Sequence, residues 1–179
     1  MQISELKQKW QKLTSGWFGN VVYIFLGFLI AIAVNETLKP VLGTDTPVVA
    51  VFSNSMLHME NFDNFWAQKG RWYEEHAFTK NQFSNFAFAN GLAKGDMVFI
   101  QGGEVKLGDI VVYDAPGYSY SIIHRVIQIK PDGIVTKGDN NDIEDPWTTP
   151  LDKIHGKAVL VVPLLGWPKV GTFEATGLA

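Results

Sequence analysis

The feature that most constrains the fold of this 179-residue chain is an apolar segment near its amino terminus. Residues 21–34, VVYIFLGFLIAIAV, carry no charged side chain and show no amphipathic stripe. A helix that is apolar on every side has no face for water, so it must lie in a membrane or inside a large protein. A helix over residues 17–34 is roughly 27 Å long, close to the bilayer hydrocarbon thickness of about 30 Å. We therefore expect a transmembrane anchor over residues 17–38.

The residues around this segment predict its orientation. Trp17, Phe18 and Tyr23 near one end suit the aromatic belt of a membrane interface. Several lysines precede the segment, whereas one lysine follows it closely. The positive-inside rule therefore places residues 1–16 in the cytoplasm and residues 40–179 outside it, in a single-pass protein of the cell membrane.

A cleavable secretory signal is the alternative interpretation of the same segment. The sequence Ala31-Ile32-Ala33 has the small-residue pattern that precedes a signal cleavage site. Either interpretation carries residues 40–179 across the membrane. A mature protein that begins at Val34 would favour the cleaved signal over the anchor.

Composition narrows the classes of partner and cofactor. A net charge of −3 and the lack of a basic run give no electrostatic reason to expect a nucleic-acid partner. The absence of cysteine excludes disulfides, cysteine-based zinc sites and a cysteine nucleophile. The acidic cluster that starts at Asp139 has Ile143 and Glu144 where a calcium loop needs an oxygen ligand and a glycine. We therefore expect neither a metal ion nor a cofactor.

Beyond Pro40 the chain consists of short β-branched runs separated by Gly, Pro, Asp and Asn, which predicts a mainly β domain. The sequence KPDG at 130–133 predicts a tight hairpin turn. The carboxyl-terminal AVLVVPLLGW is too short to span a membrane, so we expect a closing strand there. The expected strands are residues 47–52, 97–100, 109–113, 120–130, 133–137 and 156–162.

Residues 60–92 interrupt the β pattern with many aromatic residues among polar ones. We expect an inserted cap or lid whose aromatic side chains form a small core of their own. Thr79 can cap a short helix in this insert, so a partly helical insert is compatible with the sequence. A membrane-surface or substrate-guiding role is the alternative, because tryptophan and tyrosine favour the interface.

Hydroxyl and imidazole groups are the candidates for chemistry. Ser53 and Ser55 follow an apolar run in VFSNSM. A serine hydroxyl needs a neighbouring base to act as a nucleophile, and a histidine can supply that base near neutral pH. His124 lies in the apolar run SYSIIHRVIQI, where it is either a packed strand residue or such a base. A carboxylate on the other imidazole nitrogen would fix the tautomer, and GDNNDIEDP at 138–146 offers three aspartates.

Four features occur in one order along the chain: the apolar amino-terminal segment, SNSM after an apolar strand, GDIVVY followed by IIHRV, and KGDNN with a later DP. Together they resemble the type I signal peptidases, specifically the archaeal and endoplasmic-reticulum branch, which uses histidine where the common bacterial enzymes use lysine. The resemblance covers residues 17–58 and 93–165 but not the aromatic insert. It implies a signal-peptidase-like β-barrel or sandwich that removes signal peptides from secretory preproteins as a serine endopeptidase.

The resemblance also implies roles for individual residues. Ser55 corresponds to the nucleophile and His124 to its general base. Asp145 corresponds to the more critical partner of His124, with Asp139 as a support of the site. The Ser53 hydroxyl and the Ser55 backbone N–H correspond to the oxyanion hole, which stabilises the tetrahedral intermediate.

The expected substrate lies extended along the VVAVF and YSYSII segments and adds a strand through main-chain hydrogen bonds. Small side chains before the cleaved bond would fit shallow apolar pockets. Signal peptides, membrane lipid, and translocon or accessory subunits are the expected partners. The expected substrate-binding residues are Val49, Val51, Phe52, Tyr120 and Ile122.

Two departures from the family pattern and two alternatives complete the prediction. The proline usual shortly after SxSM is replaced by Leu57-His58-Met59, and no second hydrophobic span precedes Ala179. A self-cleaving serine protease on the same scaffold would normally carry a DNA-binding domain and a lysine base. A membrane-tethered, non-catalytic β-domain that binds partners through the insert predicts that Ser55, His124 and Asp145 lie apart.

Overall fold

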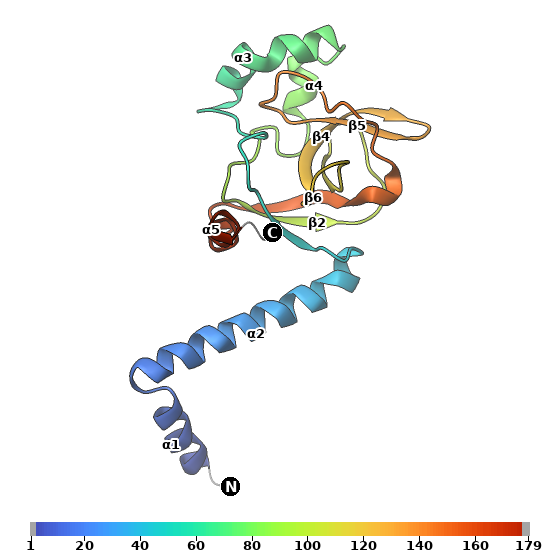
Figure 1. The fold of residues 1–179 in the computed structure, drawn as a ribbon. Helices are drawn as coiled ribbons and strands as arrows, with labels where there is room; N and C mark the ends of the chain where they lie inside the picture. Colours follow the sequence, from blue (N-terminus) through green and yellow to red (C-terminus); the bar gives the residue numbers. More distant parts are fainter. Residues whose placement is uncertain (1–2, 177–179) are drawn as a thin grey trace. The chain divides into compact units, whose positions relative to one another are not determined.

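A computed structural model describes residues 3–176 (Figure 1). The chain divides into two compact units, with the boundary between Val41 and Leu42. The first unit contains the helix α1 (Ile3–Leu13) and nearly all of the helix α2 (Gly16–Leu42). Gly16, at the start of α2, has a φ of 68°, a left-handed conformation that glycine adopts readily.

Within residues 3–176, α2 is the one helix that is long and apolar enough to cross a membrane. Its apolar side chains face outward: Ile24 is 74% exposed and Phe28 is 63% exposed. Such a surface is stable only in apolar surroundings. The prediction of one amino-terminal apolar helix, long enough to span a membrane, before a β domain is therefore confirmed, and α2 fits a single-pass protein.

The second unit is built on one antiparallel sheet with the strand order β1-β2-β6-β3-β4-β5. Every strand that we expected is present, which confirms the mainly β prediction. The hairpin between β4 and β5 turns at Pro131 and Asp132, where Lys130 pairs with Gly133. The strands are β1 (Val48–Ala50), β2 (Met97–Gln101), β3 (Ile110–Tyr113), β4 (Ile122–Lys130), β5 (Gly133–Lys137) and β6 (Ile154–Val162).

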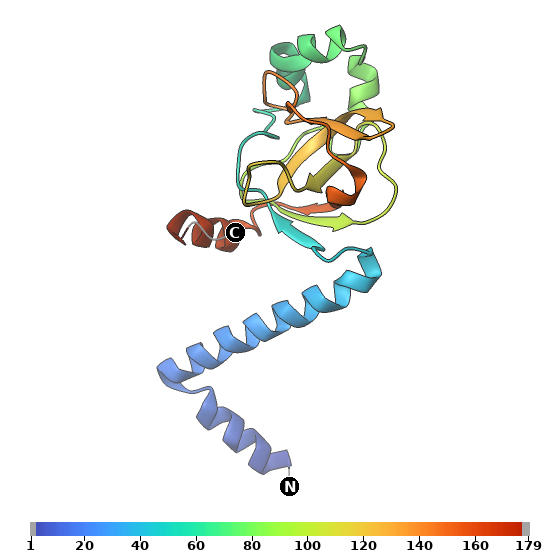
Figure 2. The ribbon, with the colours of Figure 1, turned by 45° about the vertical axis from the view of Figure 1, so that its right-hand side comes forward.

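The sheet curls, so that the central strand β3 is buried on both faces (Figures 1 and 2). Ile110 and Val112 enter one apolar cluster, and Val111 and Tyr113 enter another. Register shifts interrupt the β2–β6, β3–β6 and β4–β5 pairings. Such irregularities bend strands and increase their twist, which accounts for the curl. A short 3₁₀ helix, η1 (Leu151–Lys153), leads into β6.

The insert is helical and packs on the sheet. It contains α3 (Phe62–Glu75) and α4 (Lys80–Ser84), and Thr79 caps α4 by accepting from the Gln82 backbone N–H. The aromatic residues were expected to form a core of their own, but they share one cluster with Ile127 and Val135 of β4 and β5. The insert lies over these two strands (Figure 1). The buried aromatic members are Phe65, Trp66, Tyr73, Phe78 and Phe83.

The expected closing strand is present as β6, but a helix that was not predicted follows it. β6 stops at Val162, and α5 (Trp167–Thr176) follows after a turn. Pro163 has no N–H for the sheet, and Leu164 has a φ of 63°, so the strand cannot continue. The Gly166 N–H donates to the Gly95 carbonyl at 2.8 Å, which ties the start of α5 to the loop before β2.

Candidate active site

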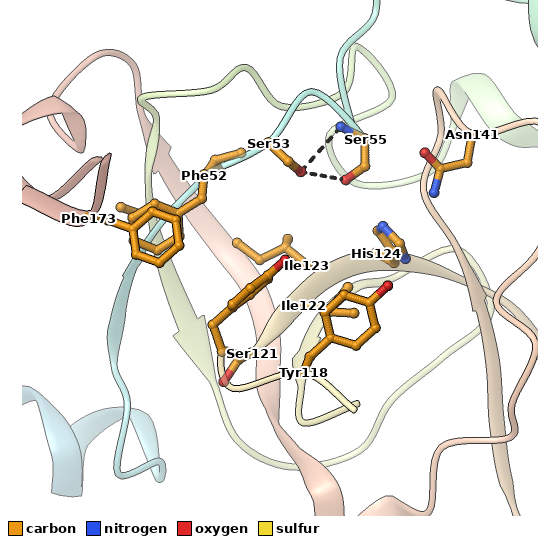
Figure 3. A pocket seen from close by; sticks show the side chains of 13 residues that line it. Phe52, Ser53, Ser55, Tyr118, Ser121, Ile122, Ile123, His124, Asn141 and Phe173 are labelled. Atoms are coloured by element: carbon orange, nitrogen blue, oxygen red, sulfur yellow. Dashed lines mark hydrogen bonds between the residues drawn. The ribbon is translucent and has the colours of Figure 1, made fainter. Parts of the chain in front are cut away.

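The serine pair lies in a tight turn that follows β1. The Leu57 N–H donates to the Asn54 carbonyl at 3.1 Å and closes the turn, while the fully buried Met56 side chain anchors it in the core. The Ser53 and Ser55 hydroxyl oxygens are 3.0 Å apart. The Ser55 backbone N–H donates to the Ser53 Oγ at 3.4 Å (Figure 3). The hydroxyl and the backbone N–H of Ser55 therefore both lie within hydrogen-bonding distance of the Ser53 hydroxyl.

His124 lies on β4 and is held by a buried carboxylate. Its Nδ1 is 2.7 Å from Oδ2 of Asp145. The same carboxylate oxygen accepts from the Tyr113 hydroxyl at 2.8 Å and from the Thr136 hydroxyl at 2.6 Å. These donors come from β3 and β5, the neighbours of β4, so the sheet itself places the Asp145 carboxylate beside the imidazole.

These contacts keep Asp145 ionised. Burial alone would raise the pKa of its carboxyl, but the hydrogen bond and charge of His124 and the bonds from Thr136 and Tyr113 outweigh burial and lower that pKa. Burial and the nearby Asp145 charge raise the pKa of Tyr113, so its hydroxyl stays a donor. An ionised Asp145 requires the proton on Nδ1 of His124, which leaves the lone pair on Nε2.

Nε2 of His124 faces the serine turn across Gly138. A Cβ atom built on Gly138 would lie 2.8 Å from His124 Nε2 and 2.8 Å from the Ser55 carbonyl oxygen. His124 Nε2 and the Ser55 carbonyl oxygen are therefore no farther apart than twice 2.8 Å. The Ser55 Oγ is hydrogen-bonded to Ser53 and not to His124 in this structure. The imidazole and both hydroxyls nevertheless line one cavity of about 280 Å³ (Figure 3).

The loop after β5 fixes the serine turn from the other side. The Asn140 N–H donates to the Ser55 carbonyl at 2.7 Å, and the Asn140 side chain donates to the Asn54 carbonyl at 3.1 Å. The Asp139 N–H lies 3.4 Å from the sulfur of Met56. Residues 138–141 thus connect the turn that carries Ser55 to the strand beside His124.

Asp139 belongs to a buried network next to the serine–histidine pair. Its carboxylate accepts from Arg125 Nε at 2.9 Å, and His58 Nε2 and the Tyr73 hydroxyl lie 3.0 Å and 3.1 Å from it. Burial would raise the pKa of Asp139, but the Arg125 charge and the bonds from His58 and Arg125 hold it well below its usual range. Asp139 therefore fixes Arg125, the neighbour of His124 on β4, and has no hydrogen bond to His124 itself.

A groove runs from the serine turn between two segments of the domain, residues 46–53 and 118–123. Of the residues expected to bind substrate, Val51, Phe52, Tyr120 and Ile122 line the cavity that holds Ser55 and His124. Val49 lines an adjoining hollow of about 520 Å³ that shares several walls with the first. Within residues 3–176, no cluster of three or more His, Asp or Glu side chains could hold a metal ion.

The sequence alone did not indicate several residues of this site. Tyr113 ends the quoted motif GDIVVY and Thr136 lies in the expected strand 133–137, but their contact with Asp145 depends on strand order. Phe173 of α5 completes the groove, with its ring centroid 4.7 Å from that of Phe52. Tyr73 had no sequence signal at all, because it lies in the insert.

Comparison with known proteins identifies relatives of the chain. It is 34% identical over 114 residues to the signal peptidase complex catalytic subunit of Schizosaccharomyces pombe, covering 62% of this chain and 54% of the relative. The corresponding subunit of Dictyostelium discoideum is 39% identical over 88 residues, which are 41% of this chain and 49% of the relative. The chain is thus similar in sequence to catalytic subunits of the signal peptidase complex.

A third signal peptidase catalytic subunit, from Scheffersomyces stipitis, is 28% identical over 141 residues, or 75% of this chain and 63% of the relative. The chain thus spans about half to somewhat under two thirds of the length of these signal peptidase subunits. No family model matches the chain. The expected relationship to signal peptidases is confirmed.

Proposed function

We propose that this chain is a membrane-anchored serine endopeptidase that cleaves signal peptides from secretory preproteins. The observation that carries the proposal is the common cavity of Ser55 and His124, with His124 hydrogen-bonded to the buried Asp145. A nucleophile, a base and a group that orients the base are the arrangement that serine acylation requires. The homology to signal peptidase catalytic subunits supplies the substrate class.

In the proposed reaction, Nε2 of His124 takes the Ser55 proton while Ser55 Oγ attacks the peptide carbonyl. For this step, the Ser55 hydroxyl exchanges its present partner, Ser53, for His124. The Ser53 hydroxyl and the Ser55 N–H then stabilise the oxyanion of the tetrahedral intermediate. His124 passes its proton to the leaving amine, and a water molecule activated by the same imidazole hydrolyses the acyl-enzyme.

The substrate is proposed to lie extended in the groove between residues 46–53 and 118–123. β1 is at one end of the sheet order, so it pairs within the sheet with β2 alone and can accept a further strand. Apolar walls that include Val51, Ile122 and Phe52 line the groove beside Ser55. Small apolar side chains before the cleaved bond suit a cavity of this size, about 280 Å³.

The proposed topology places residues 1–16 in the cytoplasm, residues 17–38 in the membrane as a signal anchor, and residues 40–179 outside the cytoplasm as the catalytic domain. In this arrangement α2 contacts membrane lipid and holds the site close to signal peptides that are still in the bilayer. The relatives are named as subunits of a complex. We propose by extension that accessory or translocon subunits are partners of this chain.

The non-catalytic alternative has less support. It predicts that Ser55, His124 and Asp145 lie apart, whereas Ser55 and His124 line one cavity and His124 contacts Asp145. A binding domain has no need for a serine hydroxyl that shares a cavity with an imidazole held by a buried carboxylate.

Cleavage of one preprotein in detergent or lipid tests the proposal. The purified wild-type chain should release the signal peptide at one bond that follows small residues, as determined by mass spectrometry of the products. Ser55→Ala should release none, and Ser84→Ala, an exposed serine in the insert, should cleave as the wild type does. Equal cleavage by Ser55→Ala and wild type would refute the proposal.

A further inference from the structure

Lys137, the last residue of β5, has a fully buried side chain. Its ammonium group forms no ion pair with a carboxylate of the described residues. Instead Nζ donates to the backbone carbonyls of Gly138 at 3.1 Å and Asp139 at 3.3 Å. A buried charge is costly unless hydrogen bonds or dipoles compensate it, so a lysine in this place calls for a specific explanation.

The compensating groups include two aromatic rings of the insert. Nζ of Lys137 lies 4.9 Å from the ring centroid of Trp72 and 4.6 Å from that of Tyr73, both on α3. The Tyr73 hydroxyl is 3.5 Å from Nζ and also donates to Asp139. Aromatic faces attract an ammonium group more strongly where water is excluded. Two aromatic rings of helix α3, those of Trp72 and Tyr73, thus hold the lysine ammonium against the sheet, and we call this pair of rings the clamp.

The two carbonyls that Lys137 binds belong to the loop that supports the candidate active site. Gly138 separates Nε2 of His124 from the Ser55 carbonyl, and Asn140 donates to that carbonyl at 2.7 Å. A rotation of the peptide groups at 138 and 139 would displace both Gly138 and the Asn140 N–H that binds the Ser55 carbonyl. Lys137 therefore binds the loop whose neighbouring residues contact Ser55, the proposed nucleophile, and His124, the proposed base.

We propose that Lys137, clamped by Trp72 and Tyr73 of the insert, is a positioning residue whose ammonium group fixes loop 138–141 and thereby the relative placement of Ser55 and His124. The loop geometry follows from the hydrogen bonds alone, whereas the effect on catalysis rests on the proposed function. The insert then contributes to the site by holding this lysine.

The charge of Lys137 makes this positioning sensitive to pH. Burial lowers the pKa of Lys137 to about 8, while the Asp139 charge opposes that shift. Lys69 lowers this pKa further, and Asp142 and Asp145 raise it. From α3 the Tyr73 hydroxyl faces the ammonium, and its pKa is raised by burial, so it stays neutral. Arg125 and His58 face the Asp139 carboxylate from β4 and the serine turn.

The sign of the pH effect separates positioning from stability. Above pH 8 the neutral amine has weaker hydrogen bonds to the two carbonyls, so the loop loosens. Between pH 8 and the unfolded pKa of about 10.4, the unfolded chain binds more protons at this lysine, so this group makes the folded state more stable as pH rises. Between pH 8 and about pH 10.4, the restraint that Lys137 places on loop 138–141 should therefore weaken. Over the same pH range, the titration of Lys137 does not lower the free energy of unfolding.

The test is Lys137→Met in the full chain, since methionine is an unbranched apolar side chain only one atom shorter than lysine and removes the charge. Hydrogen–deuterium exchange followed by mass spectrometry should show about tenfold faster exchange in peptides that cover residues 138–141 and 53–57, because a charge-assisted restraint on the loop is lost. The melting temperature should not fall, since replacement of a buried charge by an apolar group is often neutral or stabilising. Lys130→Met, on the same hairpin, is the control with no change in exchange.

The kinetic arm measures preprotein cleavage between pH 7 and pH 9.5. Wild-type kcat should decline through about pH 8, whereas Lys137→Met should have a kcat lower by about 10- to 100-fold at pH 7 and no decline of its own in that range. Trp72→Leu, which opens the clamp and keeps the lysine, should speed exchange in the same peptides.

Wild-type exchange rates in both Lys137→Met and Trp72→Leu would overturn the proposal. A Lys137→Met enzyme that keeps the wild-type kcat and alkaline decline would overturn it as well. The exchange experiment needs no substrate, so its result stands even if the wild-type chain cleaves no preprotein and the proposed function fails.

Discussion

At the scale of single residues, one carboxylate oxygen organises the candidate site. Oδ2 of Asp145 meets His124, Tyr113 and Thr136, each at 2.8 Å or less. Because all three groups donate, the charged carboxylate is the form that the site requires. The tautomer of His124 therefore depends directly on the charge of Asp145.

Asp145→Asn should consequently abolish the proposed preprotein cleavage with little change in the structure. The asparagine amide favours the wrong histidine tautomer, so kcat should fall by about 10³- to 10⁴-fold with KM nearly unchanged. Steady-state cleavage of a preprotein measures this loss, and circular dichroism checks the fold. A variant with more than a tenth of the wild-type kcat would show that Asp145 does not orient His124.

Gly138 should be intolerant of any side chain, for reasons of space and not of backbone conformation. A Cβ there would meet the Ser55 carbonyl, His124 Nε2 and the Asn141 amide, each at 2.8 Å or less. Gly138→Ala should lower kcat/KM by about 100-fold, because small displacements of reacting groups are costly. Gly171→Ala in α5, where a Cβ meets nothing within 4 Å, is the control. Equal kcat/KM for the two variants would contradict the close approach at Gly138.

The sequence motifs predicted part of this residue-scale picture. The His124–Asp145 contact was expected from the family resemblance, and the structure contains it. The contacts of Asp139 with Arg125, His58 and Tyr73 were not predicted, since they join β4, the serine turn and the insert. No local pattern encodes a contact between such distant segments. The catalytic roles of Ser55, His124, Asp145, Asp139 and Ser53 stay predictions.

At the scale of elements, β-branched runs and the turn residues between them predicted the strands, while the burial of each strand depended on packing. Residues 133–137 are buried at every position because the insert covers one face of β5 at Val135 and the cluster of Val111 and Tyr113 covers the other at Ile134. The helix α5 was not predicted, because AVLVVPLLGW was expected to form only a closing strand, whereas the strand ends at Val162 and a helix follows. Its position depends on contacts such as Trp167 with Gly95, which no sequence period reveals.

The shared core predicts that the insert and the sheet unfold together. Phe83 is fully buried and contacts Phe65, Trp66 and Tyr73, with the Arg125 guanidinium 4.8 Å from its ring centroid. Phe83→Ala should lower the free energy of unfolding by about 3–5 kcal/mol. Urea unfolding followed by fluorescence and circular dichroism should give one coincident transition. Met59→Ala, at an exposed position, is the control; two separate transitions in the wild type would refute a shared core.

At the scale of the whole molecule, the two buried aspartates make the second unit sensitive to acid. The pKa values of Asp139 and Asp145 are lowered by their partners, so both carboxylates contribute stability above the unfolded pKa of about 3.9. This contribution is lost as pH falls through their lower folded pKa values. Thermal unfolding should show a steep loss of stability below pH 4. A melting temperature that is constant from pH 6 to pH 2 would contradict these contacts.

The central claim is that Ser55 and His124 act together as nucleophile and base, and a double-mutant comparison of preprotein cleavage tests it most directly. Ser55→Ala and His124→Ala should each lower kcat by about 10⁴-fold or more, and the double variant should be no slower than the slower single variant, because residues that act as one unit are not additive. Appreciable cleavage by Ser55→Ala, or a double variant whose loss is the product of the two single losses, would contradict the claim.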